Sequence, residues 1–337
     1  MTVQDAVQVV DAPEESSGTS AERAIGTPVF VLAPPRSFSS VVAAMIGQHP
    51  QLYGLPELQL FTAETLGDWW AVCGQASFPM SHGLLRAVAE LVYGEQSPET
   101  VFQASGWLRR RLHLSTGLVM EELASRVAPR RLVEKSPSVV YDVEAMQRIQ
   151  AMFPNARFVH LVRHPRGQGD SVVKAIRQAA EHGPIPQWLL RLGALHGAPP
   201  GQAVPPDTAL APEDGWLTLH QNILEFLEGV PAGQQTRLRA EDVVADPTAS
   251  LGEVAAWLGL RTDSLAIGAM AHPEASPFAG IGPAGARLGN DLNFLQQPRL
   301  RAERASTQSL DGPLSWAPGG RGFPPAVREL AISFGYS

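Results

Sequence analysis

Residues Val29 to Pro50 read VFVLAPPRSFSSVVAAMIGQHP. The segment begins with apolar and β-branched residues, is interrupted by Pro34-Pro35, and continues with helix-forming residues. We therefore predict a strand, a tight loop and a helix in this order. The hydroxyls of Ser37, Ser39 and Ser40 are expected to cap the helix.

Such a loop is suited to binding an anion. The first turn of a helix offers unpaired backbone N–H groups and the positive end of the helix dipole, and Arg36 adds a full positive charge. Loops that bind ATP or GTP are rich in glycine and end in Gly-Lys-Ser or Gly-Lys-Thr, whose hydroxyl holds magnesium. This loop has neither feature, so we expect a ligand other than a nucleoside triphosphate. The alternative is an ordinary capped helix after a strand.

The same stretch resembles the 5′-phosphosulfate loop of sulfotransferases that use 3′-phosphoadenosine 5′-phosphosulfate (PAPS). The bacterial form of that loop usually reads Pro-Arg-Ser-Gly-Thr-Thr, whereas this chain has Phe38 at the usual glycine position and serines in place of the threonines. Phe38 restricts the backbone at one position of the loop. The resemblance implies that Arg36, Ser37, Phe38, Ser39 and Ser40 bind the cofactor.

Length and composition suit one large globular unit. The chain has 337 residues, of which 44% are hydrophobic, enough to bury a full core. We predict a mobile leader over 1–26 and a single domain over 27–337. Within this domain we expect a helical insertion over about 58–128 and loop-rich segments over about 183–214 and 272–321.

Charge and cysteine usage restrict the classes of partner and compartment. The net charge of −7 argues against a nucleic-acid-binding surface. Cys73 is the single cysteine, the start of the chain lacks the pattern of an export signal, and no apolar run has the length of a membrane span. We therefore expect a cytoplasmic protein that binds neither nucleic acid nor membrane.

A second candidate strand ends beside an acidic residue. Leu52 to Leu55 is followed by Pro56 and Glu57. Ligands of open parallel sheets bind at the carboxyl ends of the strands, so Glu57 could face the same crevice as Arg36. The alternative places Glu57 in the first turn of a helix from Leu58 to Leu66, where acidic residues are common. The residues leave both interpretations open.

A third strand is predicted from Arg131 to Glu134, followed by a loop that begins with Lys135. This position would direct Lys135 into the crevice. The sequence Glu-Lys-Ser-Pro over 134–137 resembles the Asp-Lys-Thr-Pro of bacterial sulfotransferases, and the resemblance implies that Lys135 contacts the transferred sulfuryl group. A lysine in a surface loop is the alternative, which is weakened because Lys174 is the only other lysine.

A second phosphate site is indicated by the stretch RFVHLVRHPRGQGDSVVK, residues 157–174. A buried strand is predicted over Phe158–Val162 and a helix over Asp170–Ala180. In the family, an arginine at the end of this strand and a serine eight residues later bind the 3′-phosphate. Arg163 and Ser171 have this spacing, and a phosphate dianion suits an always-charged, bidentate donor beside a hydroxyl. His160 is expected in the core.

The last third of the chain supplies supporting elements. A helix over Trp216–Leu227, a strand over Arg237–Ala240 and a helix over Ala249–Leu258 are predicted, and this region resembles sulfotransferases of bacterial polyketide pathways. Glu241 and Asp242 are interpreted as structural. In the family a late loop covers the nucleotide, often with basic residues, and the candidates for this role are Arg287, Arg299 and Arg301.

Together these features predict an α/β fold of the P-loop type, with a central, mainly parallel sheet flanked by helices. The resemblance implies transfer of a sulfuryl group from PAPS to a hydroxyl of a small molecule or of an acyl chain on a carrier protein. Arg36, Glu57 and Lys135 are the predicted catalytic residues, with Glu57 as the base and a histidine as its rival. No metal site is expected. The alternatives are an ATP-dependent kinase and a non-catalytic module that binds adenine nucleotides.

Overall fold

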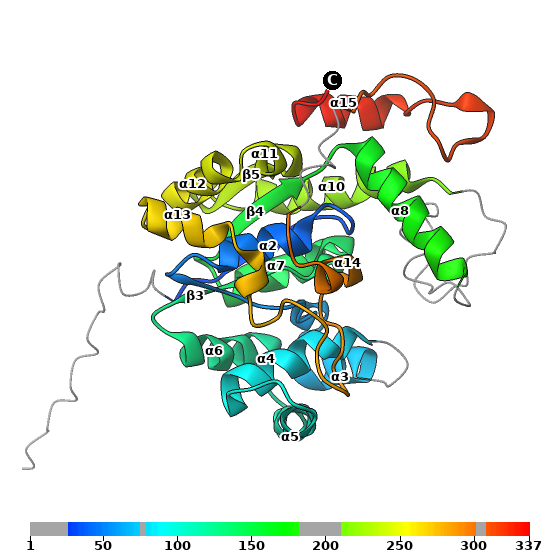
Figure 1. Cartoon of the computed structure of the whole chain (residues 1–337). Coiled ribbons are helices and arrows are strands. Elements are labelled where there is room, and N and C mark those ends of the chain that lie inside the picture. Colours follow the sequence, from blue (N-terminus) through cyan, green and yellow to red (C-terminus); the bar gives the residue numbers. More distant parts are fainter. Residues whose placement is uncertain (1–25, 75–78, 182–209, 301–307) are drawn as a thin grey trace, which may run out of the picture.

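The computed structural model describes residues 26–74, 79–181, 210–300 and 308–337. Almost all of the predicted leader, most of the predicted loop-rich segment 183–214 and Arg301 lie outside these residues. A five-stranded sheet with the order β2-β3-β1-β4-β5 forms the centre of the described part (Figure 1). Every neighbouring pair is parallel, which confirms the predicted fold class. The strands are β1 (Val29–Leu32), β2 (Leu52–Gly54), β3 (Arg131–Glu134), β4 (Arg157–Val162) and β5 (Gln235–Arg239).

The strands are buried on both faces, as expected for a parallel sheet covered by crossover helices. Phe30 and Phe158 belong to one apolar cluster, which they share with helices α4 (His82–Tyr93), α6 (Thr116–Val127), α7 (Val143–Met152), α8 (Pro165–Ala180) and α10 (Pro212–Glu228). Val31 and Val159 belong to the cluster on the opposite face, shared with α2 (Ser39–Gly47), α11 (Ala240–Ala245), α12 (Pro247–Trp257) and α13 (Ser264–Met270). Alternation of side chains along each strand therefore builds two cores, one on each face.

Several helices follow β2 and precede β3 in the sequence, and they lie on one side of the sheet in Figure 1. These are α3 (Leu66–Cys73), α4, α5 (Pro98–Arg109) and α6. The helix predicted over 58–66 is wrong, because only a short 3-10 turn, Leu60–Thr62, forms there. The backbone N–H groups of Leu58 and Gln59 instead donate to the side chains of Glu134 (3.3 Å) and Ser136 (2.8 Å). These long-range bonds, together with a left-handed φ of 58° at Gln59, exclude a helix.

Other predicted boundaries shift by a few residues. The helix after β4 begins at Pro165, where proline occupies the first position of a helix without losing a hydrogen bond. Strand β5 begins two residues earlier than predicted and ends one residue earlier, at Arg239. The segment 272–300 contains the short helix α14 (Leu292–Gln296), and the chain closes with α15 (Pro325–Ser333). None of the helices in the described part is long and apolar enough to cross a membrane.

The strand order creates a branch point at the carboxyl end of the sheet. From β1 the chain turns through α2 toward β2, whereas from the adjacent β4 it turns through α8 in the direction of β5. The two loops therefore diverge and leave a crevice between them, which is where ligands of open α/β sheets bind. Arg36 follows β1 and Arg163 follows β4, so both arginines lie at this point.

A pair of buried histidines lies in the layer beside β4. His160 Nε2 and His220 Nδ1 are 2.8 Å apart, and neither residue exposes more than 1% of its surface. The ring of His220 also contacts Trp216 and Phe334, with centroids 4.6 and 5.2 Å away. Burial lowers the pKa of both imidazoles, to about 3 for His220. Both side chains are therefore neutral in the folded protein, and His160 lies in the core as expected.

We expect the free energy of unfolding to fall as the pH decreases below about 6.5, the ordinary pKa of histidine. The unfolded chain takes up protons there that the buried imidazoles exclude, at about 1.4 kcal/mol per pH unit for each histidine. Urea unfolding between pH 7.5 and 5.0 measures this slope. The double variant His160→Leu/His220→Leu should show a flatter dependence than the wild type, and an unchanged slope would contradict the prediction.

Candidate active site

A pocket opens at the branch point between β1 and β4. Its wall contains residues from both loops predicted to bind phosphate. The first loop and the start of α2 supply Arg36, Phe38, Ser39, Ser40 and Val41, and the second loop and α8 supply Arg163 and Ser171. The structure thus brings together six of the seven residues predicted to bind the cofactor. Ser37 does not line this pocket: its hydroxyl is buried and, among the described residues, has no hydrogen-bond partner.

The first loop adopts an unusual backbone conformation. Arg36 and Phe38 have φ angles of 70° and 59°, in the left-handed region that residues other than glycine rarely occupy. Phe38 takes the N-cap position of α2, and no side chain caps this helix, so the predicted serine caps are wrong. The first intrahelical bond runs from the N–H of Val42 to the carbonyl of Phe38. The preceding N–H groups of α2 therefore lack intrahelical partners at the wall of the pocket.

Arg36 is held by groups from three separate segments. Its Nε donates to Ser171 Oγ at 3.1 Å, and its Nη1 forms an ion pair with the carboxylate of Asp291. Its carbonyl oxygen accepts a hydrogen bond of 2.5 Å from Nη1 of Arg163. One arginine therefore connects the loops after β1 and β4 with the segment before α14.

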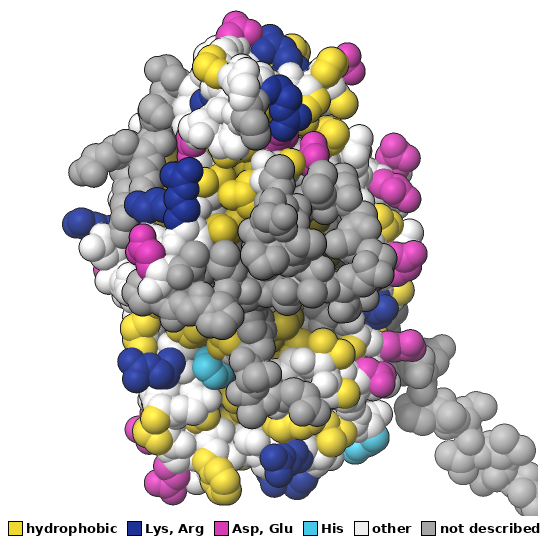
Figure 2. Space-filling model, turned by 90° about the vertical axis from the view of Figure 1, so that its right-hand side faces the viewer, with side chains coloured by type: hydrophobic (Ala, Val, Ile, Leu, Met, Phe, Trp, Pro, Cys, Tyr) yellow, Lys and Arg dark blue, Asp and Glu magenta, His cyan; other side chains and the backbone are white. Residues whose placement is uncertain are grey.

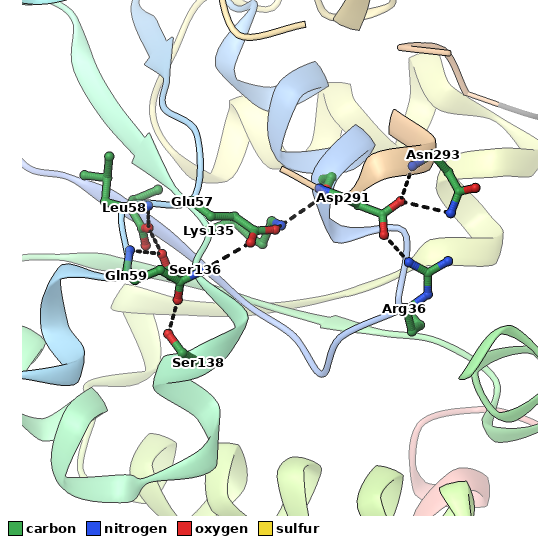
Figure 3. Close-up of polar contacts among 11 residues, drawn as sticks. Arg36, Glu57, Leu58, Gln59, Lys135, Ser136, Ser138, Asp291 and Asn293 are labelled. Carbon is green, nitrogen blue, oxygen red and sulfur yellow. Dashed lines mark hydrogen bonds and ion pairs between the residues drawn. The ribbon is translucent and has the colours of Figure 1, made fainter. Parts of the chain in front are cut away.

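Glu57 and Lys135 form an ion pair beside the pocket (Figure 3). The side chain of Lys135 is only 3% exposed, and its Nζ also donates to Ser40 Oγ at 2.9 Å. A buried ammonium requires such partners because it has lost its hydration. Neither Glu57 nor Lys135 lines the pocket itself; Ser40 connects the pair with the pocket wall. The interpretation of Glu57 as a residue in the first turn of a helix is wrong, since no helix begins there.

The backbone around Glu57 is fixed on two sides. The N–H of Glu57 donates to the carbonyl of Gly289 at 2.7 Å, and Gln59 Nε2 donates to Glu57 Oε2 at 3.2 Å. A Cβ on Gly83, at the start of α4, would lie 1.9 Å from the carbonyl oxygen of Glu57. Only glycine allows α4 to approach so closely. The helical segment after β2 and the late segment 289–293 therefore both determine where Glu57 lies.

Glu134, the first residue of the Glu-Lys-Ser-Pro sequence, is a buried carboxyl group to which the sequence assigned no role. It accepts hydrogen bonds from the N–H of Leu58 and the hydroxyl of Ser136. Burial raises the pKa of Glu134 to about 7, although these hydrogen bonds and the nearby Lys135 oppose the shift. Glu134 therefore holds the backbone of Leu58, the residue after Glu57, in place.

The late segment contributes residues that sequence reasoning found only in part. Asp291, Asn293 and Arg299 line the pocket, and α14 lies beside α2 in Figure 1. Of the three candidate arginines, Arg299 is on the pocket wall, Arg287 is absent from it and Arg301 lies outside the described residues. Nothing in the Gly-Asn-Asp sequence over 289–291 indicates that the carboxylate of Asp291 pairs with Arg36.

The rival acid–base residues, like Glu57, are absent from the pocket wall. None of the histidines in the described ranges lines it. Burial is the main cause that lowers the pKa of His164 to about 4, and the charges of nearby arginines add to the shift. The N–H of His164 donates to Glu241 at 2.9 Å, which supports the structural role expected for Glu241. Within the described residues there is no group of three His, Cys, Asp or Glu side chains that could hold a metal ion.

Comparisons with known proteins identify the family. A model described as "Sulfotransferase family" matches residues 28–264, which is more than half of the chain. The sulfotransferase domain from the curacin biosynthetic pathway aligns with a TM-score of 0.70 and 23% identity, covering 93% of this chain and 98% of that domain. The sulfotransferase domain of the Synechococcus PCC 7002 olefin synthase aligns with a TM-score of 0.66 and 25% identity, covering 93% and 96%. No curated protein matches the sequence. The chain therefore belongs to the sulfotransferase family of enzymes.

Proposed function

We propose that the protein transfers a sulfuryl group from PAPS to a hydroxyl group of a small molecule or of an acyl chain bound to a carrier protein. The observation that carries this proposal is the convergence of Arg36, Arg163 and Ser171 on one pocket at the uncapped start of α2. Two loops separated by 127 residues thereby offer two sets of anion-binding groups.

The chemistry of the pocket wall fits a ligand with two anionic ends. Arg36, Ser39, Ser40 and the N-terminal N–H groups of α2 would hold the phosphosulfate. Arg163 and Ser171 would hold the 3′-phosphate. Their charge and hydroxyl donors match a phosphate dianion, and Arg299 is the late arginine in position to add a third guanidinium.

Binding of the phosphosulfate would change the contacts of Arg36. In the structure its guanidinium is paired with Asp291 and hydrogen-bonded to Ser171. An incoming anionic oxygen competes with the Asp291 carboxylate for the same N–H groups. Asp291 also belongs to the segment that contacts Glu57 through Gly289, so this competition occurs beside the proposed base.

The proposed mechanism is an in-line displacement in which the chain positions groups and stabilises charge. When bound, PAPS supplies the sulfuryl group and a phosphate leaving group. Arg36 and the N–H groups of α2 would stabilise the negative charge that grows on the leaving oxygen. Lys135 donates to Glu57 and to Ser40 on the pocket wall, and it would assist at the transferred group. Glu57 would accept the proton of the acceptor hydroxyl.

The two alternative functions are less well supported. A kinase would need the Gly-Lys-Ser/Thr sequence that this loop lacks, and the family match opposes it. A module that only binds nucleotides would have no need for the Glu57–Lys135 pair.

Figure 2 shows acidic and basic side chains interspersed on the face it presents, unlike the single basic surface of a nucleic-acid-binding protein.

The acceptor is proposed from the likeness to polyketide-pathway sulfotransferases. This likeness, seen in the sequence, suggests a hydroxyl on a carrier-bound acyl chain. A small-molecule hydroxyl is an equal candidate.

The cofactor class can be tested by calorimetric titration with adenosine 3′,5′-bisphosphate, 5′-AMP and Mg-ATP. We expect the bisphosphate to bind most tightly. Arg163→Ala should weaken it about 10- to 150-fold, the equivalent of about 1.5–3 kcal/mol for hydrogen bonds to a charged group. Arg177→Ala, an exposed arginine farther along α8, is the matched control and should bind like the wild type. Tighter binding of Mg-ATP would refute the proposed function.

The base can be tested with Glu57→Gln. We expect the turnover number for sulfuryl transfer to fall about 10²- to 10⁴-fold, because general-base catalysis contributes about this factor. Affinity for adenosine 3′,5′-bisphosphate should change less than twofold. The acceptors are a 3-hydroxyacyl chain on an acyl carrier protein and the same chain as its pantetheine thioester.

Glu64→Gln, at an exposed glutamate in the same segment, controls for loss of charge alone. Unchanged transfer by Glu57→Gln, or an equal loss in both variants, would refute the assignment of Glu57. Faster transfer to the chain on the acyl carrier protein than to its pantetheine thioester would support the carrier-bound acceptor. Faster transfer to the pantetheine thioester would oppose it.

A further inference from the structure

We propose that Phe38 is a positioning residue for Arg163 and thereby increases the affinity for the 3′-phosphate. The inference rests on the proposed function, because it assigns a ligand to Arg163. It concerns the one residue of the first loop that departs most from the bacterial sulfotransferase pattern, in which glycine is usual.

The aromatic ring of Phe38 lies against the guanidinium group of Arg163. Arg163 Cζ is 4.1 Å from the centroid of the ring, well inside the distance of about 6 Å at which a cation and an aromatic face attract each other. Both residues line the pocket, and Arg163 is only 9% exposed. Partial removal from water strengthens the attraction.

A second contact from the same loop fixes the guanidinium. Nη1 of Arg163 donates to the carbonyl oxygen of Arg36, two residues before Phe38. The guanidinium therefore lies over the ring while the carbonyl accepts a hydrogen bond from one of its N–H groups. A guanidinium held in this way loses less rotamer freedom when it binds a phosphate dianion.

The backbone of Phe38 supports a functional reason for the ring. Its φ of 59° and ψ of 11° lie in the left-handed region, which glycine enters freely and phenylalanine enters only with strain. Strained residues cluster at binding sites, where the surrounding structure holds them in place. Glycine would fit this backbone better, but it has no ring to place against Arg163.

The effect should depend on the ligand. The 5′ end of the nucleotide is assigned to Arg36 and the start of α2, whereas Arg163 is assigned to the 3′-phosphate. Loss of the ring should therefore weaken binding of adenosine 3′,5′-bisphosphate and leave 5′-AMP nearly unaffected. A ring that only supports the loop would affect both ligands alike, because both use the loop through their 5′-phosphate.

The test compares Phe38→Leu with Phe38→Tyr by calorimetry on the full chain. Leucine keeps the apolar bulk and the backbone strain but has no aromatic face, whereas tyrosine keeps the face. We expect Phe38→Leu to weaken binding of adenosine 3′,5′-bisphosphate about 3- to 30-fold, the range of a cation–π contact. Its affinity for 5′-AMP should change less than twofold. Phe38→Tyr should bind both ligands like the wild type.

Equal losses for both ligands, or equal weakening of the bisphosphate by leucine and tyrosine, would overturn the inference. Thermal unfolding of each variant shows whether it is folded at the temperature of the titration. If Phe38→Leu is unfolded, Phe38→Gly takes its place, because glycine adopts this backbone without strain. A wild-type protein without preference for the bisphosphate over 5′-AMP would refute the proposed function, and this inference with it.

Discussion

Parallel pairing of β1 with β4 is the constraint on which the site depends. Because the chain leaves these neighbouring strands in opposite directions, their loops enclose a crevice instead of covering it. Arg36 and Arg163 follow the two strands and meet there, with a hydrogen bond between the guanidinium of Arg163 and the carbonyl of Arg36. A change in strand order would separate these two residues even if every local motif were kept.

Burial then determines which groups must pair. Lys135 directly follows β3 and is buried. Its ammonium therefore needs the carboxylate of Glu57 and the hydroxyl of Ser40 as partners. Glu134, one residue earlier, is buried and accepts the N–H of Leu58. The contacts that stabilise these polar groups are therefore the same contacts that place Glu57 next to the loop after β1. Support of the sheet and assembly of the site are not separable here.

The late segment completes the site from the far end of the sequence. The carbonyl of Gly289 accepts a hydrogen bond from the N–H of Glu57, and Asp291 forms an ion pair with Arg36, 255 residues away in the sequence. A carboxylate within a basic pocket lowers the cost of bringing several arginines together before an anion arrives. In the proposed function an anionic ligand would compete with this carboxylate for Arg36, beside the segment that contacts the proposed base.

Sequence patterns alone predicted the fold class, four of the five strands to within a residue, and the loops that carry Arg36, Lys135 and Arg163. These features follow from short-range patterns: apolar runs, proline breaks and the family-like spacing of charged residues. The sequence also placed His160 in the core. Long-range contacts, which no local pattern encodes, exclude the helical interpretation of Glu57, since the bonds that prevent a helix at 58–66 come from Glu134 and Ser136, more than 70 residues away. The Asp291–Arg36 pair and the contact of Phe38 with Arg163 were equally beyond the sequence, because strand order, and not local propensity, brings these side chains together.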